Sequence, residues 1–162
     1  RKELAAFSIP YEAKKTEYTV IVGREGPYAS AAALKDFQGA RILGEKGTKF
    51  DEVIEQIPGV IHLQPVTTIQ GMIDSVLQNK ADGAVIDTDT GHYYELTNAK
   101  LSLVNFSEDN GFRLGFNGVC VGVRKNDAGL LRNINEAIYG IKNSERQKIM
   151  DSVYSRLMTN LH

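Results

Sequence analysis

Residues 40–57 read ARILGEKGTKFDEVIEQI, and the order of apolar and glycine residues in this stretch indicates the fold class. A short apolar run predicts a β-strand over 40–44, which ends at the first glycine. After a second glycine and Thr48, apolar residues recur at helical spacing and predict a helix over 48–57. A strand, a glycine-containing turn and a helix form the repeating unit of α/β proteins.

The same alternation continues on both sides of this stretch. Buried β-branched runs and amphipathic segments follow one another, separated by glycine, proline and polar residues. The pattern predicts strands at 18–22, 40–44, 60–65, 83–86 and 101–106, and helices at 31–37, 48–57, 69–77 and around 93–96. Strands that alternate with helices in this way predict a parallel sheet covered on both faces.

The remainder of the chain has a different pattern. Residues 107–118 are polar and glycine-rich and are interpreted as a connection. A strand is predicted at 118–123, and an apolar stripe predicts a helix over 131–141. Ser144 and Gln147 have the spacing of a capping box that would start a last helix.

The composition is that of an ordinary globular protein. The 162 residues are 42% hydrophobic and 24% charged, with a formal net charge of −1. This balance argues against a nucleic-acid-binding protein, which would need a basic face. No apolar run has the length of a membrane span, and the first residues do not resemble a signal peptide. Because residue 1 is Arg rather than Met, we expect trimming or processing of the N-terminus.

The sequence has no metal or cofactor signature. The three histidines, at positions 62, 92 and 162, are not at metal-ligand spacing. Cys120 is the only cysteine, which excludes a disulfide within the chain, and its apolar neighbours favour a buried side chain over a reactive thiol. No cofactor is therefore expected.

The turn from Gly44 to Thr48 has the chemistry of an anion site. Backbone N–H groups at a helix start, together with the helix dipole, favour a carboxylate or phosphate. The turn lacks both the GxxxxGK[ST] phosphate loop and the GxGxxG dinucleotide fingerprint, so a carboxylate is the favoured anion. The simpler interpretation of this stretch alone is a tight turn with a helix N-cap.

Asp87 follows a predicted buried strand, at the same sheet edge as the Gly44 turn. Its carboxylate could hold the ammonium group of a ligand, and the two sites together would suit a zwitterion. The alternative is that Asp87 is a helix N-cap, although Asp89 or Thr90 could serve that role instead.

Four segments resemble one family of proteins. They read RKELAAFSIPY (1–11), LKDFQGARILGEKGTKFDEVI (34–54), IDSVLQNKADGAVID (73–87) and VGVRKNDAGLLRNINEAI (121–138). In order and spacing they are similar to motifs of the extracytoplasmic solute-binding proteins of polar amino acid ABC importers. These proteins have the type II periplasmic-binding fold, in which two lobes joined by hinge strands enclose the ligand.

The resemblance implies a division of this chain into parts of two lobes. Residues 16–114 would form a complete α/β lobe two. Residues 1–10 and 120–162 would form part of lobe one, with hinge strands at 11–15 and 115–119. The sequence that precedes Arg1 in the family is absent, so the chain is expected to be a C-terminal fragment that lacks most of lobe one. The last helix also departs from the Lys-Trp-Phe stretch that is frequent in the family, which leaves the subgroup open.

The resemblance also implies ligand-binding residues. Arg1 matches the arginine that pairs with the α-carboxylate of the ligand, and Asp87 matches the aspartate that takes the α-ammonium. Gly47, Thr48 and Lys49 match the helix start that contacts the same carboxylate.

Lys49 departs from the small residue that is frequent at this position, and either a charge contact or a solvent-facing side chain is open to it. Thr67 and Thr68 lie at the next helix start on this edge, and a helix cap is their simpler interpretation.

Three functions remain as alternatives. In the first, the chain binds an amino acid outside the cytoplasm, as a periplasmic protein, a surface lipoprotein or a permease-fused domain, and delivers it to an ABC permease without chemistry. In the second, the same fold is the sensor domain of a membrane receptor or kinase, which flanking sequence would reveal. The third is an enzyme that uses Asp87 with His92 or Glu95 as an acid–base pair, which no motif supports. A homodimer is also expected if the apolar faces of the last two helices are uncovered.

Overall fold

The computed structural model describes residues 4–11, 17–107, 109–115 and 118–159, without the side chains of residues 150, 154, 157 and 158. By its internal contacts the chain divides into two compact units. Unit 1 comprises Arg1–Thr16 and Gly115–His162, and unit 2 comprises Glu17–Leu114. Within the described residues, no helix is both long and apolar enough to cross a membrane.

Unit 2 is built on a five-stranded sheet with the strand order β4-β3-β5-β2-β6. The strands are β2 (Tyr18–Gly23), β3 (Arg41–Leu43), β4 (Ile61–His62), β5 (Gly83–Asp87) and β6 (Leu101–Leu103). β3 runs parallel to β4 and β5, whereas β2 runs antiparallel to its neighbours β5 and β6. The predicted α/β sheet is confirmed as a five-stranded sheet, but it is mixed rather than all parallel.

The antiparallel β2 is a correction with a physical reason. Its central residues Val20, Ile21 and Val22 are fully buried, as an interior strand requires. A strand buried on both faces carries the same apolar run whichever way it points, so residue pattern does not encode its direction. The consequence for the site is that the start of β2, at Tyr18, lies at the sheet edge where β3 and β5 end.

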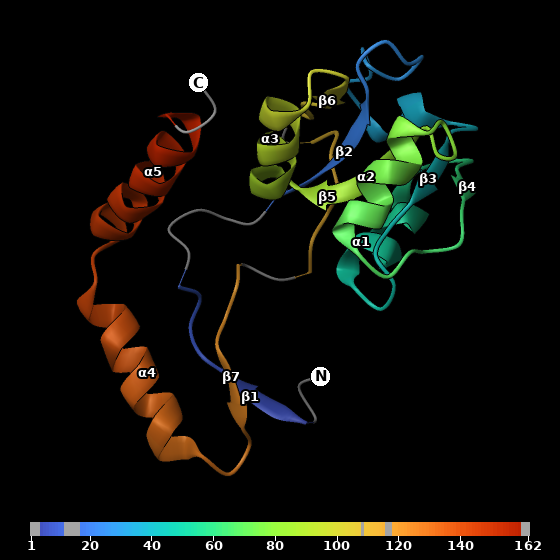
Figure 1. Cartoon of the computed structure of the whole chain (residues 1–162). Helices are drawn as coiled ribbons and strands as arrows, with labels where there is room; N and C mark the ends of the chain where they lie inside the picture. The colour runs from blue at the N-terminus through green and yellow to red at the C-terminus, as the bar shows by residue number, and fades with distance from the viewer. Residues whose placement is uncertain (1–3, 12–16, 108, 116–117, 160–162) are drawn as a thin grey trace. The chain divides into compact units, whose positions relative to one another are not determined.

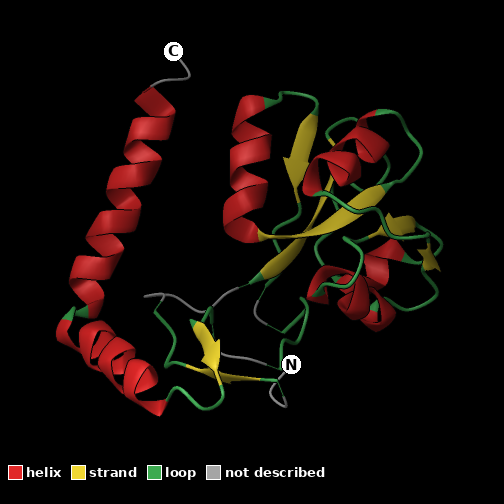
Figure 2. Cartoon of the chain, turned by 60° about the horizontal axis from the view of Figure 1, so that its bottom comes forward, coloured by secondary structure: helices red, strands yellow, loops and turns green. Residues whose placement is uncertain are grey.

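Helices cover both faces of this sheet, as Figures 1 and 2 show. On one face lie the 3₁₀ helices η1 (Leu34–Phe37) and η2 (Val53–Gln56) and the short helix α1 (Lys49–Glu52). On the other face lie α2 (Ile69–Leu77) and α3 (Thr88–Thr97). Each face has its own apolar core: Phe37 and Ile54 lie in the first, and Met72 and Ile73 in the second.

Several element boundaries differ from the prediction. The helix expected over 48–57 is divided into α1 and η2, and it ends at Ile57 in an extended conformation, as expected before Pro58. The helix expected over 31–37 is the four-residue η1, and β4 and β6 are shorter than predicted.

Unit 1 contains a two-stranded antiparallel sheet and two helices. β1 (Ala5–Phe7) pairs with β7 (Gly122–Arg124), and α4 (Ala128–Gly140) and α5 (Asn143–Thr159) follow. The strand predicted at 118–123 is wrong for 118–121, which form no strand although Ser8 bonds the backbone of Val121. Of the predicted hinge strands at 11–15 and 115–119, residues 12–15 and 116–117 lie outside the described residues, and the described residues 11, 115, 118 and 119 form no strand.

The start of α5 also differs from the predicted capping box. Ser144 lies inside the helix, and Gln147 donates to Asp151 instead. The backbone N–H of Lys142 donates to the Glu145 carboxylate at 3.1 Å. Glu145 therefore performs the capping contact that was expected from Gln147, two residues earlier in the chain.

Candidate functional site

The turn after β3 is a compact cap for α1. Thr48 Oγ1 accepts a hydrogen bond from the backbone N–H of Phe50 at 3.2 Å and donates to the carbonyl of Glu45 at 2.8 Å. Gly47 has a φ of +74°, in the left-handed region that favours glycine. The N-cap expected at Thr48 is therefore present, and the turn is closed by its own hydroxyl group.

Close backbone packing determines where this turn lies. A Cβ atom at Gly44 would lie 2.5 Å from the Cα of Asp51, so α1 rests directly on the end of β3. On its other side, the turn pairs with Val66: Lys46 N–H donates to the Val66 carbonyl at 2.7 Å, and Val66 N–H donates to the Gly44 carbonyl at 3.1 Å. These bonds bring the turn beside the segment that leads into α2.

Thr68 is the N-cap of α2. Its side chain accepts a hydrogen bond from Gly71 N–H at 3.1 Å. The cap that the sequence favoured for this position is therefore present, and it is made by Thr68 rather than Thr67. Both threonines are exposed, so Thr68 lies at an accessible helix start next to the Thr48 turn.

Lys49 is exposed and forms an ion pair with Glu52, three residues further along the same helical segment. The sequence allows either a ligand contact or a solvent-facing side chain at this position. The structure shows the solvent-facing side chain with an acidic partner, an arrangement that contributes little to stability at the surface.

Asp87 is the last residue of β5 and the N-cap of α3. Its Oδ1 accepts a hydrogen bond from Thr90 N–H at 2.9 Å. The capping role is therefore filled by Asp87 itself and not by Asp89 or Thr90. Within the described part of the chain, only this oxygen of the half-buried carboxylate accepts a hydrogen bond, so its second oxygen remains available for a donor.

Tyr18 connects the two halves of this sheet edge, and the sequence analysis missed it. It is the register partner of Asp87 across the β2–β5 ladder, and its ring lies 4.8 Å from that of Phe50, centroid to centroid. Burial, followed by the negative charges of Asp87 and Glu52, raises the pKa of Tyr18 to about 12. The phenol is therefore neutral at physiological pH. The sequence shows an aromatic residue at the first position of the predicted strand. In an all-parallel sheet, however, the first residue of a strand lies at the edge opposite to the one where β3 and β5 end. The predicted parallel sheet therefore placed Tyr18 away from the site.

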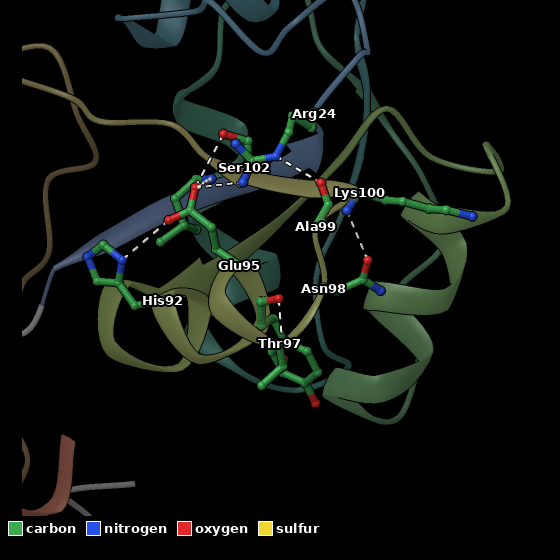
Figure 3. Close-up of polar contacts among 10 residues, drawn as sticks. Arg24, His92, Glu95, Thr97, Asn98, Ala99, Lys100 and Ser102 are labelled. Atoms are coloured by element: carbon green, nitrogen blue, oxygen red, sulfur yellow. Dashed lines mark hydrogen bonds and ion pairs between the residues drawn. The ribbon is translucent and has the colours of Figure 1, made fainter. Parts of the chain in front are cut away.

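The residues of the enzyme hypothesis have structural roles (Figure 3). One oxygen of Glu95 accepts hydrogen bonds from Leu103 N–H at 2.9 Å and Ser102 Oγ at 3.3 Å, which satisfies one backbone N–H on the outer edge of β6. His92 Nδ1 lies 3.5 Å from the other oxygen, and Arg24 lies 3.9 Å from the first. Glu95 thus holds α3 to the edge strand, and nothing in these contacts resembles an acid–base pair with Asp87.

Two further expectations concern Arg1 and a metal site. Arg1 lies outside the described residues, so its contact with a ligand carboxylate stays a prediction. No group of three or more His, Cys, Asp or Glu residues in the described ranges is arranged to hold a metal ion.

Neither a protein-family model nor a curated protein matches the chain. Solved structures do match. An amino acid ABC transporter substrate-binding protein from Streptococcus pneumoniae, bound to L-arginine, is 23% identical with a TM-score of 0.78, and the match covers 96% of this chain and 62% of that one. AbpA, a protein of the same kind and source, also bound to L-arginine, gives 16% identity and a TM-score of 0.80, covering 98% and 64%.

An ancestral arginine-binding protein bound to glutamine is similar as well. It is 20% identical, with a TM-score of 0.75 over 94% of this chain and 64% of its own. These matches show that the chain has the type II periplasmic-binding fold of amino acid substrate-binding proteins. The chain spans less than two thirds of the length of these proteins. All three are named as binding proteins rather than enzymes.

Proposed function

We propose that this chain binds an amino acid outside the cytoplasm and serves an ABC importer, with its permease as partner. The observation that carries the proposal is that two candidate ligand-binding groups lie at one edge of the unit 2 sheet. There, the capped turn at Thr48 and the carboxylate of Asp87 are linked through Tyr18 and Phe50. A helix start, whose partial positive charge favours an anion, and a carboxylate acceptor at one edge match the two charged groups of a zwitterion.

The α-carboxylate is assigned to the Thr48 turn. The first N–H groups of a helix have no partner within the helix, and their partial positive charge favours an anion. Gly47 is exposed and has no side chain that would cover the turn. The Thr48 hydroxyl donates to Glu45, so the hydroxyl that can donate to a ligand at this edge is that of Thr68, at the start of the neighbouring α2. A hydrogen bond to a charged partner contributes roughly 1.5–3 kcal/mol, so two or three of them suffice to select a carboxylate.

The α-ammonium is assigned to Asp87. Oδ1 is committed to the cap of α3, which fixes the orientation of the carboxyl group, and Oδ2 faces no described donor. The neighbouring Tyr18 adds a neutral phenol and an aromatic surface, both of which suit an ammonium group. The amino acid complexes of structurally similar proteins support the same class of ligand.

The test separates the charge of Asp87 from its cap. We expect calorimetric titration against the twenty amino acids to find at least one ligand for the wild-type chain. Asp87→Asn retains a cap oxygen, because Asn is as good an N-cap as Asp. Its melting temperature should stay near that of the wild type, while affinity falls about thirtyfold, the consequence of losing about 2 kcal/mol of charge pairing.

Asp89→Asn is the matched control, because Asp89 is an exposed carboxylate in the first turn of the same helix. It should leave affinity unchanged. The proposal is wrong if no amino acid binds the wild-type chain, or if the two variants bind equally well.

A further inference from the structure

One histidine joins the edge strand β4 to the helical segment that follows the Thr48 turn. His62 Nε2 lies 2.7 Å from Asp51 Oδ1, and His62 Nδ1 lies 3.0 Å from Glu55 Oε1. Asp51 is in α1 and Glu55 is in η2. A single ring therefore holds this segment against the sheet at two points, which we call the His62 clamp.

The clamp is complete only when the imidazole is protonated. A neutral imidazole has one N–H donor, so it can bond one of the two carboxylates while its other nitrogen lone pair faces the second. Burial lowers the pKa of His62, but the hydrogen bonds to Asp51 and Glu55, with their charges, outweigh this and leave the pKa above its ordinary value. The doubly bonded form therefore persists to higher pH than it would for a histidine with an ordinary pKa.

No other described charge competes for this ring. The adjacent strand β3 places Ile42 opposite His62, and Arg41 of that strand is paired with Asp82. The ring nitrogens thus face only the two carboxylates of the clamp.

The clamp acts on the segment that begins at the candidate site. None of the four residues of α1 is fully buried, and its one apolar residue, Phe50, is only partly buried against the first core. The position of α1 depends on the Thr48 cap and on the packing of Phe50 against the core. It depends also on Asp51, whose backbone contacts Gly44 and whose side chain bonds His62. A change at His62 therefore reaches the Thr48 turn through Asp51.

We propose that His62 is a pH-dependent positioning residue for the Thr48 turn. Protonated His62 holds α1 and η2 on the sheet, and its deprotonation releases one of the two carboxylates and loosens the turn. Because the folded pKa is raised, the stabilisation is complete below the unfolded value of about 6.5 and is lost as pH rises through the folded pKa. The part that concerns ligand affinity rests on the proposed function, whereas the part that concerns local order does not.

Amide hydrogen exchange of residues 48–56 tests the clamp without a ligand. We expect protection, corrected for the intrinsic pH dependence of exchange, to fall about fivefold between about pH 6 and about pH 8.5, which corresponds to one hydrogen bond. His62→Gln should remove this pH dependence. His92→Gln, which changes a histidine of α3 that faces Glu95, should retain it.

Glu55→Gln provides a second variant that is expected to fold, because 77% of the Glu55 side chain is exposed. It should reduce the pH dependence without abolishing it. The inference is overturned if wild-type protection at 48–56 does not change with pH, or if it changes equally in His62→Gln.

The same pair of pH values tests the effect on the ligand. L-arginine and L-glutamine serve as probes, and the affinity of each is measured at both pH values in wild type and in His62→Gln. We expect the gain in affinity on going to the lower pH to be about fivefold larger in the wild type than in the variant. That variant corrects for titration of the amino acid itself. Equal changes in both proteins would contradict a positioning role. If neither these probes nor any other amino acid binds at either pH, the proposed function fails, and the exchange data still decide whether the clamp exists.

Discussion

Replacing Gly44 by Ala should displace the helix on which the candidate site is built. The new Cβ would lie 2.5 Å from Asp51 Cα, 2.6 Å from Asp51 N and 2.8 Å from Phe50 C. All three are backbone atoms, so no rotamer change can relieve the contact. Carbon atoms in ordinary contact are about 3.5–4.0 Å apart, and α1 must therefore move by about 1 Å.

The loss in the free energy of unfolding follows from the overpacked contact between residue 44 and the backbone of α1. Overpacking of a rigid contact costs about 1–3 kcal/mol, and the upper half of that range applies here because the obstacle is backbone. We expect Gly44→Ala to lower the free energy of unfolding by about 2–3 kcal/mol. Gly23→Ala is the matched control, because a Cβ at that strand end meets no atom within 4 Å, and it should change stability by less than about 0.5 kcal/mol.

Urea unfolding followed by far-ultraviolet circular dichroism measures both variants, since the chain has no Trp to report by fluorescence. The displaced Thr48 turn should also weaken ligand binding in Gly44→Ala alone. Equal urea midpoints for the two variants would refute the argument that α1 rests on Gly44.

Three further outcomes are expected. Arg41 donates to Asp82 and lowers the pKa of that carboxyl group. The pairing therefore stabilises the fold above about pH 4, and this stabilisation is lost as pH falls through the lower pKa of the folded state. The urea midpoints of wild type and Arg41→Met should converge at the acid end of a pH series. Glu95→Gln retains an acceptor for Leu103 N–H and should keep near-wild-type stability, whereas Glu95→Leu leaves that N–H unpaired and should lose about 1–3 kcal/mol in the same assay. Tyr139 is 85% exposed in a unit that exposes several other large apolar side chains, and light scattering should show association that rises with concentration and is reduced in Tyr139→Ser.

The secondary structure of unit 2 was largely predictable because its signals are local. The apolar spacing of α2 and the β-branched run of β2 lie within single segments, and so do the threonine and aspartate caps at the helix starts. A cap needs only its own side chain and an N–H two or three residues later, so Thr48 and Asp87 could be identified from sequence.

The relations between segments were not predictable in the same way. The antiparallel direction of β2 depends on pairing with β5, and Tyr18 joins the site only through that pairing. The His62 clamp brings together residues of β4, α1 and η2 whose side chains meet through tertiary packing. Unit 1 was less well predicted, because the GVCVGV run has the composition of a strand but pairs only over its last residues with β1.

The proposed amino acid site is the sheet edge formed by the Thr48 turn and Asp87. Chemical-shift mapping tests it most directly: ¹⁵N-labelled chain is titrated with each amino acid in turn, and backbone amide shifts are followed. We expect at least one amino acid to shift two separated groups of amides, at 47–50 and at 87–90, with one common dissociation constant. An amino acid that shifts only one of these groups, or a full series that shifts neither, would contradict the proposed site.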